Sequence, residues 1–187
     1  MPVRAGWSPA GGGAAQRAVA IGLTAVAILA TLATMGRVSV LLCAAMAVSC
    51  WLWLDGRLRA RPRTLRLIVI AVGILLLDIG EEYVTGFQRA FPGLVGHQWS
   101  DGRFLAYNLV WIAVFAAAGL GVSHEVALAS LAVGFLAIGA GVANGVGHVA
   151  LALARRGYFP GLLTAPLCFA AGIALLRSIW QPRRPPA

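Results

Sequence analysis

Long apolar stretches separated by short polar segments make up most of this chain. The stretches are too long, and too rich in alanine and leucine, for membrane β-barrel strands, which alternate over about ten residues. Several approach the roughly 20 residues that a helix needs to cross a bilayer. They run from Ala18 to Met35, Val38 to Leu54, Leu65 to Thr85, Phe104 to Val122, Val126 to Ala154 and Leu162 to Ile179. The pattern predicts an all-α, polytopic membrane helical bundle of about six transmembrane helices.

Composition supports this class, because 60% of the 187 residues are hydrophobic and only 11% are charged. The length suits one transmembrane domain, residues 18–180, with a flexible N-terminal tail, 1–17, and a Pro-rich C-terminal tail, 181–187. A cleaved signal peptide is the alternative for the first stretch. Cys43, Cys50 and Cys168 fall in apolar stretches without metal-type spacing, so we interpret them as buried apolar residues.

The net charge of +9 comes from arginine, because the chain has no lysine. An even number of helices places both termini and the segment Arg57 to Arg66 on one side, and most arginines fall there. The positive-inside rule then predicts cytoplasmic termini. We therefore expect a multi-pass protein of a bacterial inner membrane and no nucleic-acid partner. A polybasic patch for DNA or anionic lipid at Arg57 to Arg66 is the alternative. The arginines on the expected cytoplasmic side are Arg4, Arg17, Arg57, Arg59, Arg61, Arg63, Arg66, Arg177, Arg183 and Arg184.

Acidic residues gather in the third apolar stretch, which holds Asp78, Glu81 and Glu82 of only six Asp and Glu residues in the chain. A carboxylate in a bilayer is costly and usually faces a protein interior or a watery cavity, where it serves a function. At about 100° per residue, the three side chains fall within one sector of a helix. They can therefore face one pocket.

Polar residues of other stretches lie at the same expected depth as these acids. The fifth stretch carries Asn144 and His148, four residues apart and so on one helical face. Tyr158 follows in the next connection, and Asn108 lies early in the fourth stretch. We expect the catalytic residues to be Asp78, Glu81, Glu82, Asn144, His148 and Tyr158, and the substrate-binding residues to be Asn108, Trp111 and Phe159.

Three short motifs in this order resemble the HXXEE family of membrane proteins, whose pattern is HxxEE followed by NxxxH and YxPG. Here they are residues 78–82, 144–148 and 158–161, with Asp78 in place of the leading histidine. The resemblance extends over about the third to the sixth stretch. It implies an integral membrane fold with a shared polar site, and it implies no reaction.

Neighbouring carboxylates in a low dielectric repel one another, so a proton, an arginine or a divalent cation must compensate them. Asp78, Glu81, Glu82 and His148 have suitable ligand atoms for Zn, Fe or Mn. Without a metal, a protonated and an ionised carboxyl can act as acid and base. We therefore expect a membrane enzyme that uses acid-base or metal-assisted chemistry on an apolar, lipid-like substrate from the bilayer. Cyclisation or isomerisation of an isoprenoid is one version; the alternatives are a proton- or cation-coupled transporter and a purely structural cluster.

Overall fold

A computed structural model describes residues 12–90, 94 and 99–182. Arg4, Arg183 and Arg184 lie outside this part of the chain. The named elements of the described residues are all helical. They are α1 (Ala14–Met35), η1 (Gly36–Ser39), α2 (Val40–Leu54), η2 (Pro62–Thr64), α3 (Leu65–Thr85), α4 (Phe87–Ala90), α6 (Asp101–Ser123), α7 (Ala129–Phe135), η3 (Leu136–Ala143), α8 (Asn144–Arg155) and α9 (Ala165–Ile179). The all-α prediction is confirmed.

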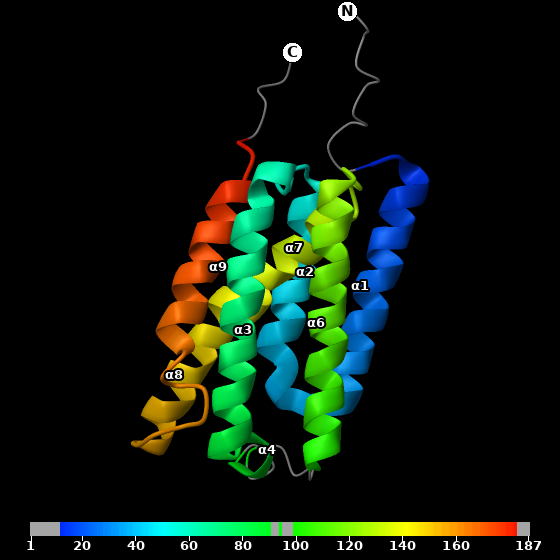
Figure 1. Ribbon diagram of the computed structural model, residues 1–187. Helices are drawn as coiled ribbons and strands as arrows, with labels where there is room; N and C mark the ends of the chain where they lie inside the picture. Colours follow the sequence, from blue (N-terminus) through cyan, green and yellow to red (C-terminus); the bar gives the residue numbers. More distant parts are fainter. Residues whose placement is uncertain (1–11, 91–93, 95–98, 183–187) are drawn as a thin grey trace, which may run out of the picture.

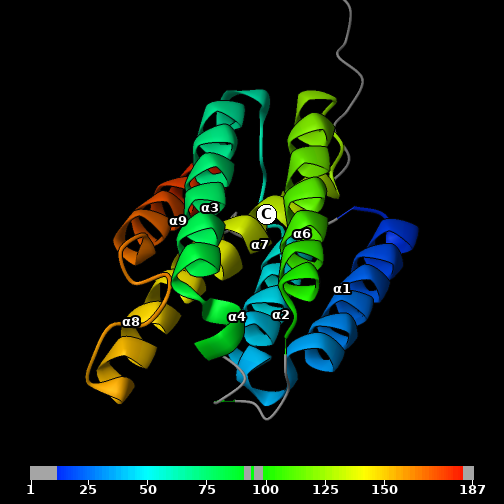
Figure 2. The same ribbon diagram turned by 60° about the horizontal axis from the view of Figure 1, so that its bottom comes forward.

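The long helices run up and down the bundle in alternating directions, as Figure 1 shows. The start of α1 and the end of α9 lie at the same end of the bundle, which we call the terminus end. The connection between α3 and α6, which contains α4, and the turn between α8 and α9 lie at the opposite end, which we call the far end (Figures 1 and 2). This course places the last turns of α3 beside α8 and the start of α9.

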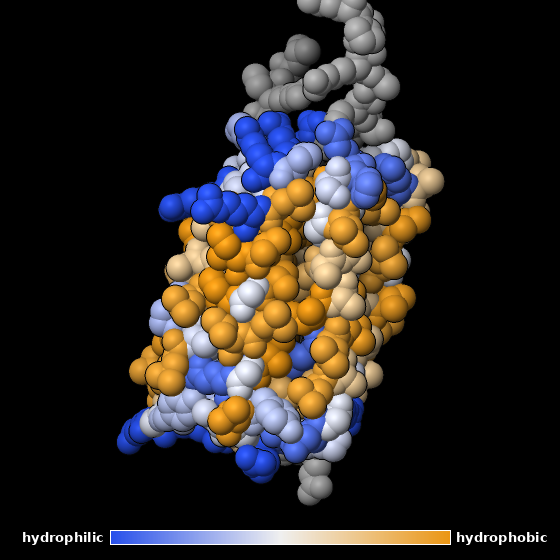
Figure 3. Space-filling view, in the orientation of Figure 1, coloured by the Kyte–Doolittle hydropathy of each residue, from blue (hydrophilic) through white to orange (hydrophobic). Residues whose placement is uncertain are grey.

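Three helical segments of the described chain are long and apolar enough to cross a membrane: Ala14–Met35, Asp101–Ser123 and the continuous Ala129–Arg155. Val40–Leu54 and Ala165–Ile179 are apolar but shorter. The face in Figure 3 carries an apolar belt between two polar ends. These features indicate a membrane protein. The helices lie within a few residues of the stretches expected from hydropathy, and α1 begins at Ala14, before the predicted end of the tail.

The main core lies where α7, η3 and α9 cross α2, α3 and α6. Val133, Ala137, Leu175 and Ile179 are fully buried there, and Phe115 of α6 is 1% exposed. These apolar side chains point inward, whereas Val26 of α1 and Val84 of α3 face outward. An apolar exterior is what a lipid environment requires.

Glycines let η3 and α8 approach α9 closely. A Cβ on Gly141 would lie 2.5 Å from the Cα of Gly172, and one on Gly145 would lie 2.6 Å from the Ala165 carbonyl oxygen. The pair Gly141 and Gly145 has the small-xxx-small spacing of close helix contacts. The segment η3 is a π-helix, which changes the angular register of the residues that follow. Asn144 and His148 come directly after it.

Adding a methyl group at Gly141 should therefore destabilise the bundle. We expect Gly141→Ala to lower the free energy of unfolding by about 1–3 kcal/mol, because the new Cβ meets backbone that must shift. Gly147→Ala is the matched control, since its Cβ would meet only the Leu41 side chain at 3.8 Å. Thermal unfolding in detergent measures both variants, and equal losses would contradict the close α9 contact.

Candidate membrane-embedded acid and histidine site

Two carboxylates of α3 and one imidazole of α8 meet inside the bundle. Asp78 and Glu82 are one helical turn apart and are 1% and 6% exposed, and His148 is 3% exposed. The His148 Nε2 atom lies 3.2 Å from Glu82 Oε1 and 4.0 Å from Asp78 Oδ2. The i, i+4 spacing puts both acids on the same face of α3, from which their side chains reach His148. We call Asp78, Glu82 and His148 the buried triad.

Asp78 is held by donors from two other segments. The Asn144 side-chain amide donates to Asp78 Oδ2 at 2.7 Å. The hydroxyl of Thr164, just before α9, lies 2.5 Å from Asp78 Oδ1. Both carboxylate oxygens are thus engaged, which satisfies the requirement that buried polar atoms have partners.

Glu81 points to the α8–α9 connection instead of to His148. It accepts hydrogen bonds from the Tyr158 hydroxyl at 2.7 Å and from the backbone N–H groups of Leu163 and Thr164 at 3.0 and 2.8 Å. The Thr164 hydroxyl lies 2.7 Å from the same carboxylate. Partial burial and the bond to Glu81 raise the pKa of Tyr158, so its hydroxyl stays a donor. Glu81 therefore fastens this connection to α3.

The Thr164 hydroxyl lies between the carboxyl groups of Asp78 and Glu81. Its oxygen lies 2.5 Å from Asp78 Oδ1, 2.7 Å from Glu81 Oε2 and 3.2 Å from the Gly161 carbonyl oxygen. A hydroxyl has one proton to donate but can accept from others. Two short contacts to carboxyls are accommodated when one of the carboxyls carries a proton, or when the single hydroxyl proton is shared between the two oxygens. The geometry thus accommodates a protonated acid beside an ionised one.

Thr164 should consequently matter more for stability than Tyr158. Thr164→Val leaves Asp78 Oδ1, which is buried, without its donor and removes one donor from Glu81, so it should cost about 1–3 kcal/mol. Tyr158→Phe should cost about 0.5–1.5 kcal/mol, because Glu81 keeps its other donors. Thr164→Ser keeps the hydroxyl and is the control. Unfolding in detergent measures all three, and an inverted order would contradict this account.

Aromatic side chains surround the triad toward the far end. The Phe87 ring of α4 lies 6.0 Å from the His148 ring, and Phe159 lies 6.2 Å from it. Phe87 also packs on Phe104 and Phe159. Gly161 adopts φ +88 and lies against the imidazole, where a Cβ would collide with the ring. This packing keeps the imidazole in place and shields it on that side.

Asp78 and Glu82 of the triad border a small cavity of about 80 Å³ between α3 and α6, which we call the acid pocket. On the face in Figure 3, the surface is hollowed between these two helices. Asp78, Glu82 and Asn144 line the acid pocket together with Asn108, and most of its other lining residues are apolar or aromatic. The acids thus face a space that a small group can enter.

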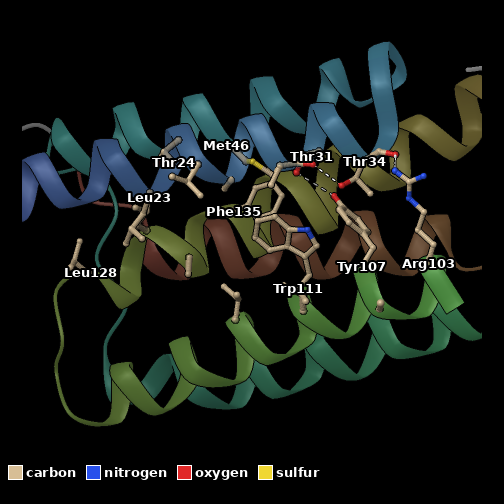
Figure 4. Close-up of a pocket in the computed structure, with 18 residues that line it drawn as sticks. Leu23, Thr24, Thr31, Thr34, Met46, Arg103, Tyr107, Trp111, Leu128 and Phe135 are labelled. Atoms are coloured by element: carbon tan, nitrogen blue, oxygen red, sulfur yellow. Dashed lines mark hydrogen bonds between the residues drawn. The ribbon is translucent and has the colours of Figure 1, made fainter. Parts of the chain in front are cut away.

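A second cavity of about 760 Å³, the large cavity, lies between α1, α2, α6 and α7 (Figure 4). Its lining includes Leu23, Val26 and Val110, which are more than half exposed, so it opens at the outer, apolar surface. Tyr107, Trp111 and Phe135 line both cavities. We call these three residues the aromatic wall, and the Trp111 and Phe135 rings lie 4.7 Å apart in it. An apolar molecule in the large cavity would lie one layer of side chains from the acids.

The site residues expected from the sequence fall into three groups: the buried cluster, the lining of the acid pocket, and Phe159, which lines neither cavity. Asp78, Glu82, Asn144 and His148 come together, and Tyr158 reaches the group through Glu81. Asn108 and Trp111 line the acid pocket, and the Asn108 amide also donates to the Phe104 carbonyl at 3.0 Å. Phe159 is fully buried behind His148 and is not among the residues lining either cavity.

Sequence reasoning missed Thr164 and two residues of the aromatic wall, Tyr107 and Phe135. A threonine at the start of an apolar stretch resembles an ordinary helix start, and aromatic residues in membrane helices are common. Only the YxPG motif pointed to this connection. The spacing of Thr164 from that motif carried no separate signal.

The buried triad is also the group that could hold a metal ion. One ligand atom from each of its residues falls within 4.8 Å of the others. Asn144 would orient Asp78 from outside, as outer partners of metal ligands do. Glu81, which the sequence also suggested as a ligand, is occupied by the α8–α9 connection.

A lipid-facing helical bundle with a buried carboxylate and histidine cluster defines an integral membrane protein with a polar site inside the bundle. Residues 81–175 match a family model described as "Protein of unknown function with HXXEE motif", and the chain belongs to this HXXEE family. The match begins at Glu81, so Asp78 lies just before it. No curated protein and no solved structure matches the chain.

Proposed function

We propose that this protein is an integral membrane enzyme that acts on an apolar, lipid-like substrate at the buried triad. The proposal includes six membrane crossings. Three are the segments long and apolar enough to cross a membrane, Ala14–Met35, Asp101–Ser123 and Ala129–Arg155, and the other three are α2, α3 and α9. It places both termini in the cytoplasm of a bacterial cell and the triad in the outer half of the membrane. The shared terminus end (Figure 1) and the arginines at residues 57–66 support this orientation.

One observation carries the proposal: the acid pocket, lined by Asp78 and Glu82, shares the aromatic wall with the large apolar cavity. Burying two acids beside a histidine is expensive, and a structural role would not require an adjoining cavity. A substrate that enters from the lipid can lie in the large cavity with its reactive bond at the wall. Small movements of Tyr107 or Trp111 would join the two cavities.

The chemistry that the side chains support directly is acid-base catalysis. A protonated carboxyl in a low-dielectric pocket can donate a proton to an alkene, epoxide or carbonyl, and a neighbouring base can remove one later. Asp78 is suited to be the acid, because it is buried and shares the Thr164 hydroxyl with a second carboxyl, an arrangement that accommodates a neutral Asp78. Glu82 and His148 are the proton acceptors. Cyclisation or isomerisation of an isoprenoid is a concrete reaction of this type.

A divalent cation bound by the triad would supply Lewis acidity to the same substrate. His148 favours this version, because its buried Nε2 faces two carboxylates, at 3.2 Å from Glu82 Oε1 and 4.0 Å from Asp78 Oδ2. Zn, Fe and Mn accept this mixture of oxygen and nitrogen ligands. In either version the triad performs the chemistry and the aromatic wall positions the substrate.

Turnover in detergent tests the proposal. Purified protein is incubated with a total lipid extract of bacterial membranes, and the extract is compared by mass spectrometry with one incubated with heat-inactivated protein. We expect some lipid species to fall and others of related mass to rise. Unchanged lipids in detergent, together with proton or cation flux into sealed vesicles, would contradict an enzyme and favour a transporter.

A further inference from the structure

The large cavity is apolar along its length but has polar groups at one end. In Figure 4, Leu23 and Leu128 lie toward one end, and Thr34, Tyr107 and Arg103 toward the other. Arg103 donates to the Thr34 carbonyl at 3.2 Å. Near it, the hydroxyls of Thr31 and Tyr107 lie 3.5 Å apart. The cavity therefore has the polarity of an amphiphile, with one apolar and one polar end.

The polar end of the cavity is positively charged. Arg103 is an exposed cation, and no carboxylate among the described residues forms an ion pair with it. It lies in the first turn of α6, whose N-terminus adds partial positive charge. The nearby carboxylate of Asp101 accepts a hydrogen bond from Gln88. An anion at this mouth would gain the guanidinium donors that the Thr34 carbonyl does not use.

We infer that the large cavity binds a membrane amphiphile with one long apolar chain and one anionic head group, held at Arg103. That this amphiphile is the substrate rests on the proposed function. The residues from Arg103 to Val114 span about 16 Å of α6 at the usual helical rise. This length accommodates a single lipid chain lying along the helix. The head group stays at the far end, where the polar surface of the bilayer lies.

The same geometry indicates which part of the amphiphile meets the acids. Tyr107 and Trp111 follow Arg103 by one and two helical turns, or about 6 and 12 Å along α6. Both belong to the wall that borders Asp78 and Glu82. The bond that reacts should therefore lie in the chain within that distance of the head group, rather than at its far end.

A comparison of three head groups tests the inference. Tetradecyl phosphate, tetradecanol and tetradecyltrimethylammonium have the same chain with an anionic, neutral and cationic head. Each is added to purified protein in detergent, and bound ligand is measured by native mass spectrometry. We expect the phosphate to bind about tenfold more tightly than the other two, which corresponds to one well-placed charged contact. Equal binding of all three would overturn the inference.

Three variants test whether Arg103 is the residue that causes the preference for the phosphate head group. Arg103→Gln should remove the preference for phosphate without changing tetradecanol binding, whereas Arg156→Gln, an arginine of the same end away from the cavity, should keep it. Ala27→Phe, which fills the cavity from α1, should weaken binding of all three compounds. A preference that survives in Arg103→Gln would overturn the assignment of the head-group site.

Glu82→Gln separates this inference from the proposed function. The variant should keep the preference for phosphate, because Glu82 lines the acid pocket and not the large cavity. If the preference is present but lipid extracts are never altered, the binding site stands and the enzyme proposal fails. If extracts are altered but the three heads bind equally, the enzyme proposal stands and this inference fails.

Discussion

Replacing Glu82 with glutamine should lower the rate of lipid conversion at least about 100-fold, the loss typical of a missing acid or base. The amide has the size of the carboxyl but can neither take a proton nor carry the charge that faces His148 Nε2 at 3.2 Å. The rate of product formation in detergent, followed by mass spectrometry, is the measurement. Binding of the substrate should change little, because the large cavity remains.

Glu125→Gln is the matched control for this change. Glu125 is an exposed glutamate at the terminus end, so the same chemical substitution is made away from the site. The control should keep full activity, and both variants should unfold near the wild-type temperature. A Glu82→Gln protein that retains more than about a tenth of the wild-type rate would contradict a role of Glu82 in the chemistry.

The second prediction is that substitutions in the buried triad remove bound metal from the purified protein. If a cation compensates the triad, purified protein should contain about one equivalent of Zn, Fe or Mn, since one such group of ligands is present in the described chain. Asp78→Asn and His148→Gln should each remove it. Asn144→Ala should weaken binding by roughly 10–100-fold, because the amide only orients Asp78. Elemental analysis and metal titration measure these losses.

Glu81→Gln is the decisive comparison for the metal. Glu81 is adjacent to Glu82 in the sequence, but its carboxylate is bonded to Tyr158, Leu163 and Thr164. The variant should therefore keep the metal and lose some stability. Loss of metal on Glu81→Gln alone would contradict the division of the acids that the structure shows. Fully active protein without any metal would leave the acid-base version.

Hydropathy predicted the helices well, because a membrane helix must be apolar over most of its length. The stretch Leu65 to Thr85 coincides with α3, and Gly86, with φ +84, ends it. The π-helical segment η3 was not predictable, since its glycines resemble those of ordinary close packing. The structure shows that Gly141 and Gly145 pack closely against α9.

The expected depth of each polar residue in the membrane predicted which residues of the site would meet, because helices that alternate in direction place residues of equal depth at the same level of the bundle. Asp78, Asn144 and His148 were found in this way. Rotation about the helix axis was harder to predict, so the different directions of Glu81 and Glu82 were not anticipated. Thr164, Tyr107 and Phe135 could not be found at all, because apolar and hydroxyl residues leave no distinct pattern in membrane helices.

Coupling between Glu82 and His148 tests most directly whether α3 and α8 form one working site. Turnover is measured for Glu82→Gln, for His148→Gln and for the double variant. Residues that act as a unit are strongly non-additive, so we predict that the double variant is no slower than the slower single variant. Losses that multiply, as they would for two independent positions, would contradict the account.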